Sequence, residues 1–138
     1  MSNAHERMNI ERMAFWAELA AQAPELGIDA SPGWEKEIPI GQGGRLKLKM
    51  SLSQDKTSVY LVARSPEATA WIQANLDALK KGLRTVPGDS SGEAGAGRWF
   101  RKDHKDAVAV RRQWPEMIRW LRAQHATVMR AIQEIEQQ

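Results

Sequence analysis

Apolar residues recur at helical spacing in the last part of the chain, from about Gln113 to Gln137. The recurring positions are Trp114, Ile118, Leu121, Val128, Ile132 and Ile135, with His125 in the one remaining slot. Alternating steps of three and four residues place these side chains along one seam of a long helix. We expect the seam to be covered either by strands encoded upstream or by a second copy of the chain.

Strict alternation of apolar and polar residues predicts strands in the middle of the chain. In 46–52, leucine and methionine alternate with lysine and serine, and 58–64 repeats the pattern after a short turn. Ile38 and Ile40 flank Pro39, which predicts an edge strand because proline cannot donate a ladder hydrogen bond. The three segments form an antiparallel meander with one buried face and one basic face.

Two further helices are predicted from apolar spacing and from their end signals. Residues 6–23 form the first, and its expected buried stripe is Ile10, Met13, Ala17 and Ala20, widened by Phe15, Trp16 and Leu19. Residues 66–81 form the second, with Ser65 as its N-cap and Gly82 as its terminator.

The predicted order is helix, three-stranded meander, helix, two strands and long C-terminal helix. The two short strands are expected at 83–86 and 98–102, on either side of a flexible glycine-rich loop at 87–97. This order is typical of an α+β (broadly α/β) domain with a mostly antiparallel sheet and helices packed on one face. A length of 138 residues suits one domain spanning 1–138, in which we expect 1–8 to be disordered or an expression remnant.

Composition removes several classes of site. The chain has no cysteine, which excludes disulfides and thiolate metal sites and is typical of a reducing, cytoplasmic location. No apolar run approaches the roughly 18 residues of a membrane span, so no membrane association is expected. The three histidines are dispersed along the chain, and neither a metal nor a cofactor is predicted.

Charge is nearly balanced overall, at +3, but it is unevenly placed. Residues 45–64 carry five bases and one acid, and residues 98–112 carry six bases and two acids, a net charge of +4 in each block. Such blocks meet phosphates or acidic partners, and aromatic residues among the bases would allow stacking on nucleic-acid bases. The candidate contact residues are Arg45, Lys47, Lys49, Arg64, Arg98, Trp99, Arg101, Lys102, Lys105, Arg111 and Arg112.

Scattered aromatic and apolar motifs resemble a known family over about residues 10–135. The motifs are Phe15-Trp16, Trp34, Trp71-Ile72-Gln73, Trp114-Pro115-Glu116-Met117-Ile118 and Trp120-Leu121. Together they are similar to domain of unknown function family 4268, in which Gly97-Arg98-Trp99-Phe100 is the nearest match to the strand after the middle helix. Members often sit at the C-terminal end of larger proteins associated with nuclease or defence functions. The resemblance therefore implies an accessory or recognition role and supplies no catalytic residues.

We therefore expect a non-enzymatic binding domain that recognises nucleic acid or a protein partner through a basic sheet face. A first alternative is a protein–protein or self-association module, with a possible homodimer through the C-terminal helix. Its interface residues would be His125, Val128, Ile132 and Ile135. A second alternative is a degenerate or cryptic metal-dependent nuclease, in which Asp89, Asp103 and Lys105 would hold Mg²⁺ and orient a water.

Overall fold

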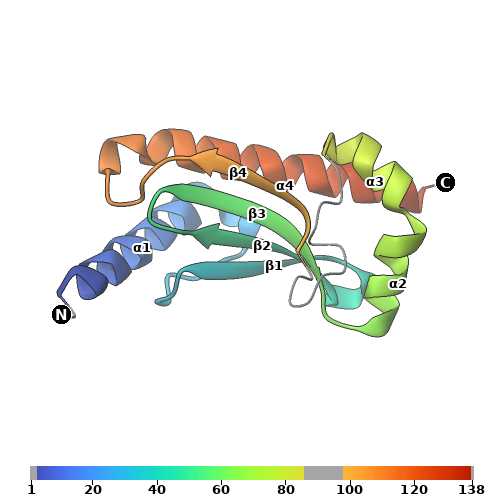
Figure 1. Cartoon of the computed structure of the whole chain (residues 1–138), viewed down its shortest axis with the longest axis horizontal. Helices are drawn as coiled ribbons and strands as arrows, with labels where there is room; N and C mark the ends of the chain where they lie inside the picture. The colour runs from blue at the N-terminus through green and yellow to red at the C-terminus, as the bar shows by residue number, and fades with distance from the viewer. Residues whose placement is uncertain (1–2, 86–97, 138) are drawn as a thin grey trace.

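One antiparallel sheet and the helices around it make an α+β architecture (Figure 1). The computed structural model describes residues 3–85 and 98–137. The strands, in sheet order, are β1 (Glu35–Gly41), β2 (Leu46–Leu52), β3 (Lys56–Ala63) and β4 (Trp99–Lys105). The helices are α1 (Asn3–Gln22), α2 (Pro66–Ala74), α3 (Leu76–Leu83) and α4 (Trp114–Glu136), with short turns η1 (Pro24–Leu26), η2 (Gln42–Gly44) and η4 (Arg111–Gln113). The predicted fold class and the predicted meander are confirmed.

Strand register explains how the sheet acquires one apolar face. Leu48 pairs with Ile38 of β1 on one side and with Leu61 of β3 on the other. Because directly opposed residues of antiparallel strands share a face, alternate positions build one continuous apolar surface, which we call the inner face. Its buried members are Ile38, Ile40, Leu46, Leu48, Met50, Leu52, Val59 and Leu61. Buried side chains of α1 and α4 belong to the same core cluster as these residues.

The apolar seam of α4 is buried within the chain itself. Ile118, Leu121, Val128 and Ile132 are all 5 % exposed or less. Figure 1 shows α4 running along the sheet, with α3 beside its C-terminal half. The sequence allowed the seam to be covered by upstream strands or by a second copy of the chain. In the structure the chain's own sheet covers it, and α3 packs beside it.

The first helix buries only one side of the predicted stripe. Ile10 and Met13 of the expected stripe are 58 % and 38 % exposed, and Ala17 is exposed as well. The buried residues are Phe15, Trp16 and Leu19, which were predicted to widen the stripe, and Ala23. The predicted centre of the stripe was therefore wrong, whereas its predicted widening by Phe15, Trp16 and Leu19 is confirmed.

The aromatic pair of α1 fixes its rotation. The Phe15 ring meets the Trp114 ring edge-on, with 5.4 Å between centroids. The indole of Trp16 donates a hydrogen bond to the backbone oxygen of Gly33 at 2.8 Å. Two aromatic rings bury far more apolar area than the Ile10 stripe could, so the helix turns them toward the core.

The middle helix is two helices that meet at Asn75. As predicted, Ser65 caps the first of them, and its hydroxyl accepts a hydrogen bond from the Ala68 N–H at 3.0 Å. At Asn75 the backbone leaves helical geometry, and its side-chain amide donates to the Trp71 carbonyl at 2.8 Å. This side-chain hydrogen bond competes with the helical ladder, and the chain restarts as α3.

The predicted strand at 83–86 was wrong. Gly82 and Leu83 lie inside α3, and Arg84 ends that helix in a left-handed conformation with φ 57°. Val86 and the predicted loop at 87–97 lie outside the described residues. The last strand begins at Trp99 and extends to Lys105, with a bulge opposite Val59 and Leu61 at which Phe100 has φ 58°.

In the described part of the chain, no helix combines the length and hydrophobicity needed to cross a membrane.

Candidate functional site

The second face of the sheet carries most of the predicted contact residues. Lys49 pairs with Glu37 on β1 and with Tyr60 on β3, and Lys47 lies two residues earlier on the same face. Arg64 joins them, since its guanidinium forms an ion pair with Glu37. We call this surface the outer face, because its residues alternate with those of the inner face.

Two carboxylates of β1 neutralise part of the positive charge. Lys49 Nζ lies 3.2 Å from Glu35 Oε1 and 3.3 Å from Glu37 Oε2, and the lysine side chain is only 15 % exposed. Arg64 donates to Glu37 Oε1 at 3.2 Å. The Arg64 guanidinium lowers the pKa of Glu37, partial burial opposes this, and Lys49 adds to the lowering. Lys49 and Arg64 are therefore engaged inside the chain, by glutamates that the charge-block reasoning missed.

Residues from the start of β4 extend the outer face. Arg101 donates to Asp103 Oδ1 at 2.9 Å and to Ser58 Oγ at 3.3 Å. Partial burial raises the pKa of Asp103, but hydrogen bonds from Ser58 and Arg101 lower it by more. The Arg98 guanidinium lies 5.6 Å from the centre of the Tyr60 ring, within reach of a cation–π interaction.

The remaining outer-face cations are less engaged. Lys56 and Lys105 stand directly opposite each other across β3 and β4, an arrangement that like charges disfavour. Lys56 Nζ lies 3.9 Å from Asp103 Oδ2, a long ion pair. Within residues 3–85 and 98–137, Lys47 and Lys105 form no ion pair. The same holds for Arg45, which is exposed at the end of η2, before β2, and is not counted with this face.

The structure does not bring the other predicted contact residues to this face. Lys102 pairs with Val59 and so belongs to the inner side of the sheet. Arg111 forms an ion pair with Glu11 of α1, and Arg112 is exposed just before α4. Trp99 is 5 % exposed and packs in the core, so its ring is not available for stacking on a nucleic-acid base.

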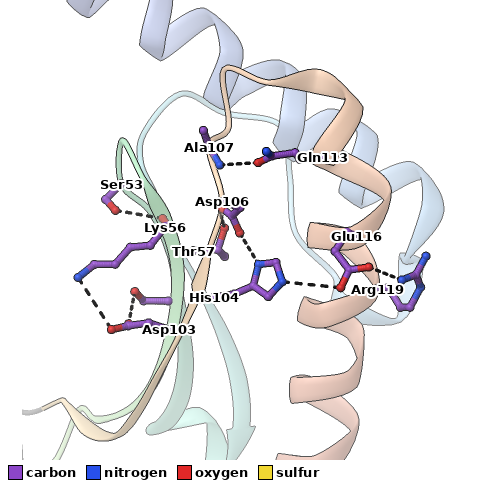
Figure 2. A network of polar contacts seen from close by, with 11 residues as sticks. Ser53, Lys56, Thr57, Asp103, His104, Asp106, Ala107, Gln113, Glu116 and Arg119 are labelled. Carbon is purple, nitrogen blue, oxygen red and sulfur yellow. Dashed lines mark hydrogen bonds and ion pairs between the residues drawn. The ribbon is translucent and has the colours of Figure 1, made fainter.

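Sequence reasoning also missed a polar network around His104 (Figure 2). Figure 2 shows Asp103 and Lys56 on one side of the strands and His104 on the other, pointing toward α4. His104 Nδ1 lies 2.7 Å from Asp106 Oδ2, and its Nε2 lies 3.7 Å from Glu116 Oε2. The imidazole also lies against Trp120, with 5.2 Å between ring centroids.

Asp106 connects His104 to Thr57 of β3 and so anchors this network in the sheet. It is 8 % exposed, and its Oδ1 accepts a hydrogen bond from Thr57 Oγ1 at 2.9 Å while its Oδ2 holds His104. The imidazole therefore lies between a buried carboxylate at hydrogen-bonding distance and a second, exposed carboxylate that is too far away for a hydrogen bond. Because Nε2 faces Glu116 rather than a hydroxyl, we interpret the network as a link between the end of β4 and the first turn of α4.

The geometry gives little support to the nuclease alternative. Asp103 is held by Ser58, Arg101 and Lys56. Asp89 lies outside the described residues, and in the described ranges no group of three or more histidine, aspartate or glutamate side chains could hold a metal ion.

The predicted self-association residues divide into two pairs. Val128 and Ile132 are 5 % and 2 % exposed within the single chain. His125 and Ile135 are partly buried at the margin of the same seam. Burial lowers the pKa of His125, and the charge of Glu25 opposes that shift.

The chain matches no protein-family model, no curated protein and no solved structure. The similarity to domain of unknown function family 4268 stays a prediction.

Proposed function

We propose that this chain is a non-enzymatic binding domain whose outer face contacts the phosphate backbone of nucleic acid. The observation that carries the proposal is the excess of cations over acids on that face. Its bases are Lys47, Lys49, Lys56, Arg64, Arg98, Arg101 and Lys105, and its acids are Glu35, Glu37 and Asp103. Seven bases against three acids leave a net charge of +4 on one sheet surface. Phosphate contacts of this kind supply most of sequence-independent binding.

The position of Trp99 narrows the mode of recognition. The Trp99 ring is buried in the core, so it cannot stack on a nucleic-acid base between the neighbouring cations, although the sequence predicted such stacking. Contacts through lysine and arginine alone read the backbone and carry little sequence information. We therefore expect binding that tolerates any sequence and weakens steeply with salt. A cytoplasmic location stays a prediction.

Fluorescence anisotropy with a labelled single strand and a labelled duplex tests the proposal. We expect binding at low salt with a linear dependence of log Kd on log salt. Lys47→Gln with Arg101→Gln should weaken binding about tenfold and flatten the slope by about 1 to 2, because up to two phosphate contacts are lost. Arg122→Gln, which removes an exposed cation paired with Glu25 on the helical side, is the control. Absent binding at low salt, or equal losses in the control and the double variant, would refute the proposal.

A protein partner is the second candidate, and the exposed stripe of α1 favours it. Self-association through α4 has little apolar surface to use, because Val128 and Ile132 are buried in the core. Ile10 and Met13 of α1, by contrast, are exposed. Sedimentation equilibrium of the wild type and of Ile10→Ser would detect association through α1. A monomer at all concentrations would leave this candidate without support as a self-association module.

A further inference from the structure

A basic cavity lies between α3, α4 and β4, on the side of the sheet away from the outer face. Its volume is about 630 Å³. Of the residues that the structure describes, four cations and one acid line it: Lys81, Arg84, Lys102, Arg130 and Glu134. They come from three different elements, which the fold brings together from positions up to about fifty residues apart.

Among the described residues, Glu134 is the one acid in the lining, so the cavity carries a positive excess. Among residues 3–85 and 98–137, none of the four cations forms an ion pair. Burial lowers the pKa of Lys102, and the charge of Arg84 lowers it further. A lysine that is partly buried beside another cation destabilises its surroundings unless an anion joins it.

The cavity is built on close helix packing. A Cβ added to Gly82 would lie 2.8 Å from the Cβ of Ala131, so α3 and α4 touch at this point. Immediately after this contact, Arg84 adopts φ 57°, and its N–H donates to the Lys80 carbonyl at 2.9 Å. The left-handed residue lies where α3 ends, beside the cavity. Lys102 reaches the same space because its register with Val59 turns it away from the outer face.

The lining offers more than charge. Leu83, Ala131 and Ile135 supply an apolar wall, and Thr127 adds a hydroxyl. The volume falls within the roughly 300–1,000 Å³ of small-molecule sites and exceeds what a lone phosphate ion fills. Four cations with one carboxylate suit a ligand with two or more negative charges.

We propose that this cavity binds an organic phosphate of nucleotide size, with its phosphates at Arg84, Lys102 and Arg130 and its uncharged part against the apolar wall. The site is separate from the outer face. Consecutive residues of β4 divide between the two surfaces, with Arg101 on the outer face and Lys102 in the cavity.

Isothermal titration calorimetry of the full chain with ATP, tripolyphosphate and adenosine tests the proposal, without magnesium and at low salt. We expect ATP to bind with a Kd of about 100 μM or tighter, tripolyphosphate several-fold more weakly, and adenosine not measurably. Lys102→Gln and Arg130→Gln should each weaken ATP binding about tenfold. Lys105→Gln is the matched control, since it removes the next cation of β4 and does not line the cavity; it should change the Kd by less than about twofold.

Thermal unfolding separates lost binding from lost folding. Without ligand, Lys102→Gln should melt at the wild-type temperature or above it, because it removes repulsion with Arg84. With ATP, the wild type and Lys105→Gln should gain clearly more stability than Lys102→Gln or Arg130→Gln does.

Three results would overturn the proposal. They are no ATP binding, equal weakening by Lys102→Gln and Lys105→Gln, and equal affinity for ATP and tripolyphosphate. The nucleic-acid proposal is tested independently of the ATP proposal, because Lys47→Gln with Arg101→Gln should leave ATP binding unchanged.

Discussion

His125 occupies the one position of the α4 seam that carries a titratable side chain, and it is partly buried there. Burial lowers its pKa below the ordinary value of 6.5, against the opposing charge of Glu25. Between the folded and the unfolded pKa, the unfolded chain binds more protons, so stability rises with pH in that window. We expect the folding free energy contributed by neutral His125 to be complete above about pH 7 and to be lost as the pH falls through the folded pKa.

Urea unfolding at about pH 8 and about pH 5.5 measures this effect. His125→Gln should show a smaller loss of stability on acidification than the wild type does. Identical losses in the two proteins would mean that His125 is not the group responsible.

Gly82 shows how a single missing methyl group can set the distance between two helices. In a helix interior, glycine-to-alanine substitution ordinarily stabilises by about 1 kcal/mol. At Gly82 the new Cβ would meet Ala131 at 2.8 Å, so α3 must move away from α4. We expect Gly82→Ala to destabilise by about 1–3 kcal/mol despite its better helix propensity.

A double-mutant cycle provides the control. Combining Gly82→Ala with Ala131→Gly removes the Cβ that the new methyl group would meet. The effects of the two substitutions on the free energy of unfolding should therefore be far from additive. Additive losses of stability in urea unfolding would show that the contact does not govern Gly82.

At the scale of elements, the three strands of the meander were the most predictable part of the fold, whereas the strand predicted at 83–86 is absent from the described residues there. Their period of two fixed both the pairing and the faces, because a one-residue slip would expose Leu46 through Leu52. The helices were less predictable, because apolar spacing on α1 allowed more than one buried face. The observed face is selected by the contact of Phe15 with Trp114, about a hundred residues later in the chain, and by the hydrogen bond from Trp16 to Gly33.

The rotation of α1 leads to a prediction about stability. Ile10 belongs to the face that periodicity favoured but is 58 % exposed, whereas Leu19 is fully buried. Ile10→Ser should change the free energy of unfolding by less than about 0.5 kcal/mol, and Leu19→Ala should cost about 2–5 kcal/mol. Equal effects in thermal or urea unfolding would indicate that α1 packs through the Ile10 stripe after all.

At the scale of the whole molecule, the two basic blocks of the sequence map onto one surface only in part, because Lys102, Arg111 and Arg112 lie elsewhere. Counting charges along the chain could not separate Arg101 from Lys102, since adjacent strand residues point to opposite faces. It also could not find Glu35 and Glu37, which lie in an acidic region of the sequence but pair with Lys49 across the sheet. Alternation within β1 was the signal available. No sequence signal could have identified the cavity cations Arg84 and Arg130 as neighbours, because only tertiary packing brings them together.

Glu35 and Glu37 of β1 should therefore lower the affinity of the outer face for anions. Glu35→Gln with Glu37→Gln would free Lys49 and Arg64, the two cations that these carboxylates engage. If the outer face binds nucleic acid, this variant should bind about threefold to tenfold more tightly, with a salt slope steeper by about 1 to 2. Glu18→Gln with Glu67→Gln makes the same change in net charge at exposed helical positions and serves as the control. Equal gains in both variants would attribute the effect to net charge alone. A selective gain in the β1 variant, measured by anisotropy across a salt series, would place the contact on the cations that Glu35 and Glu37 restrain.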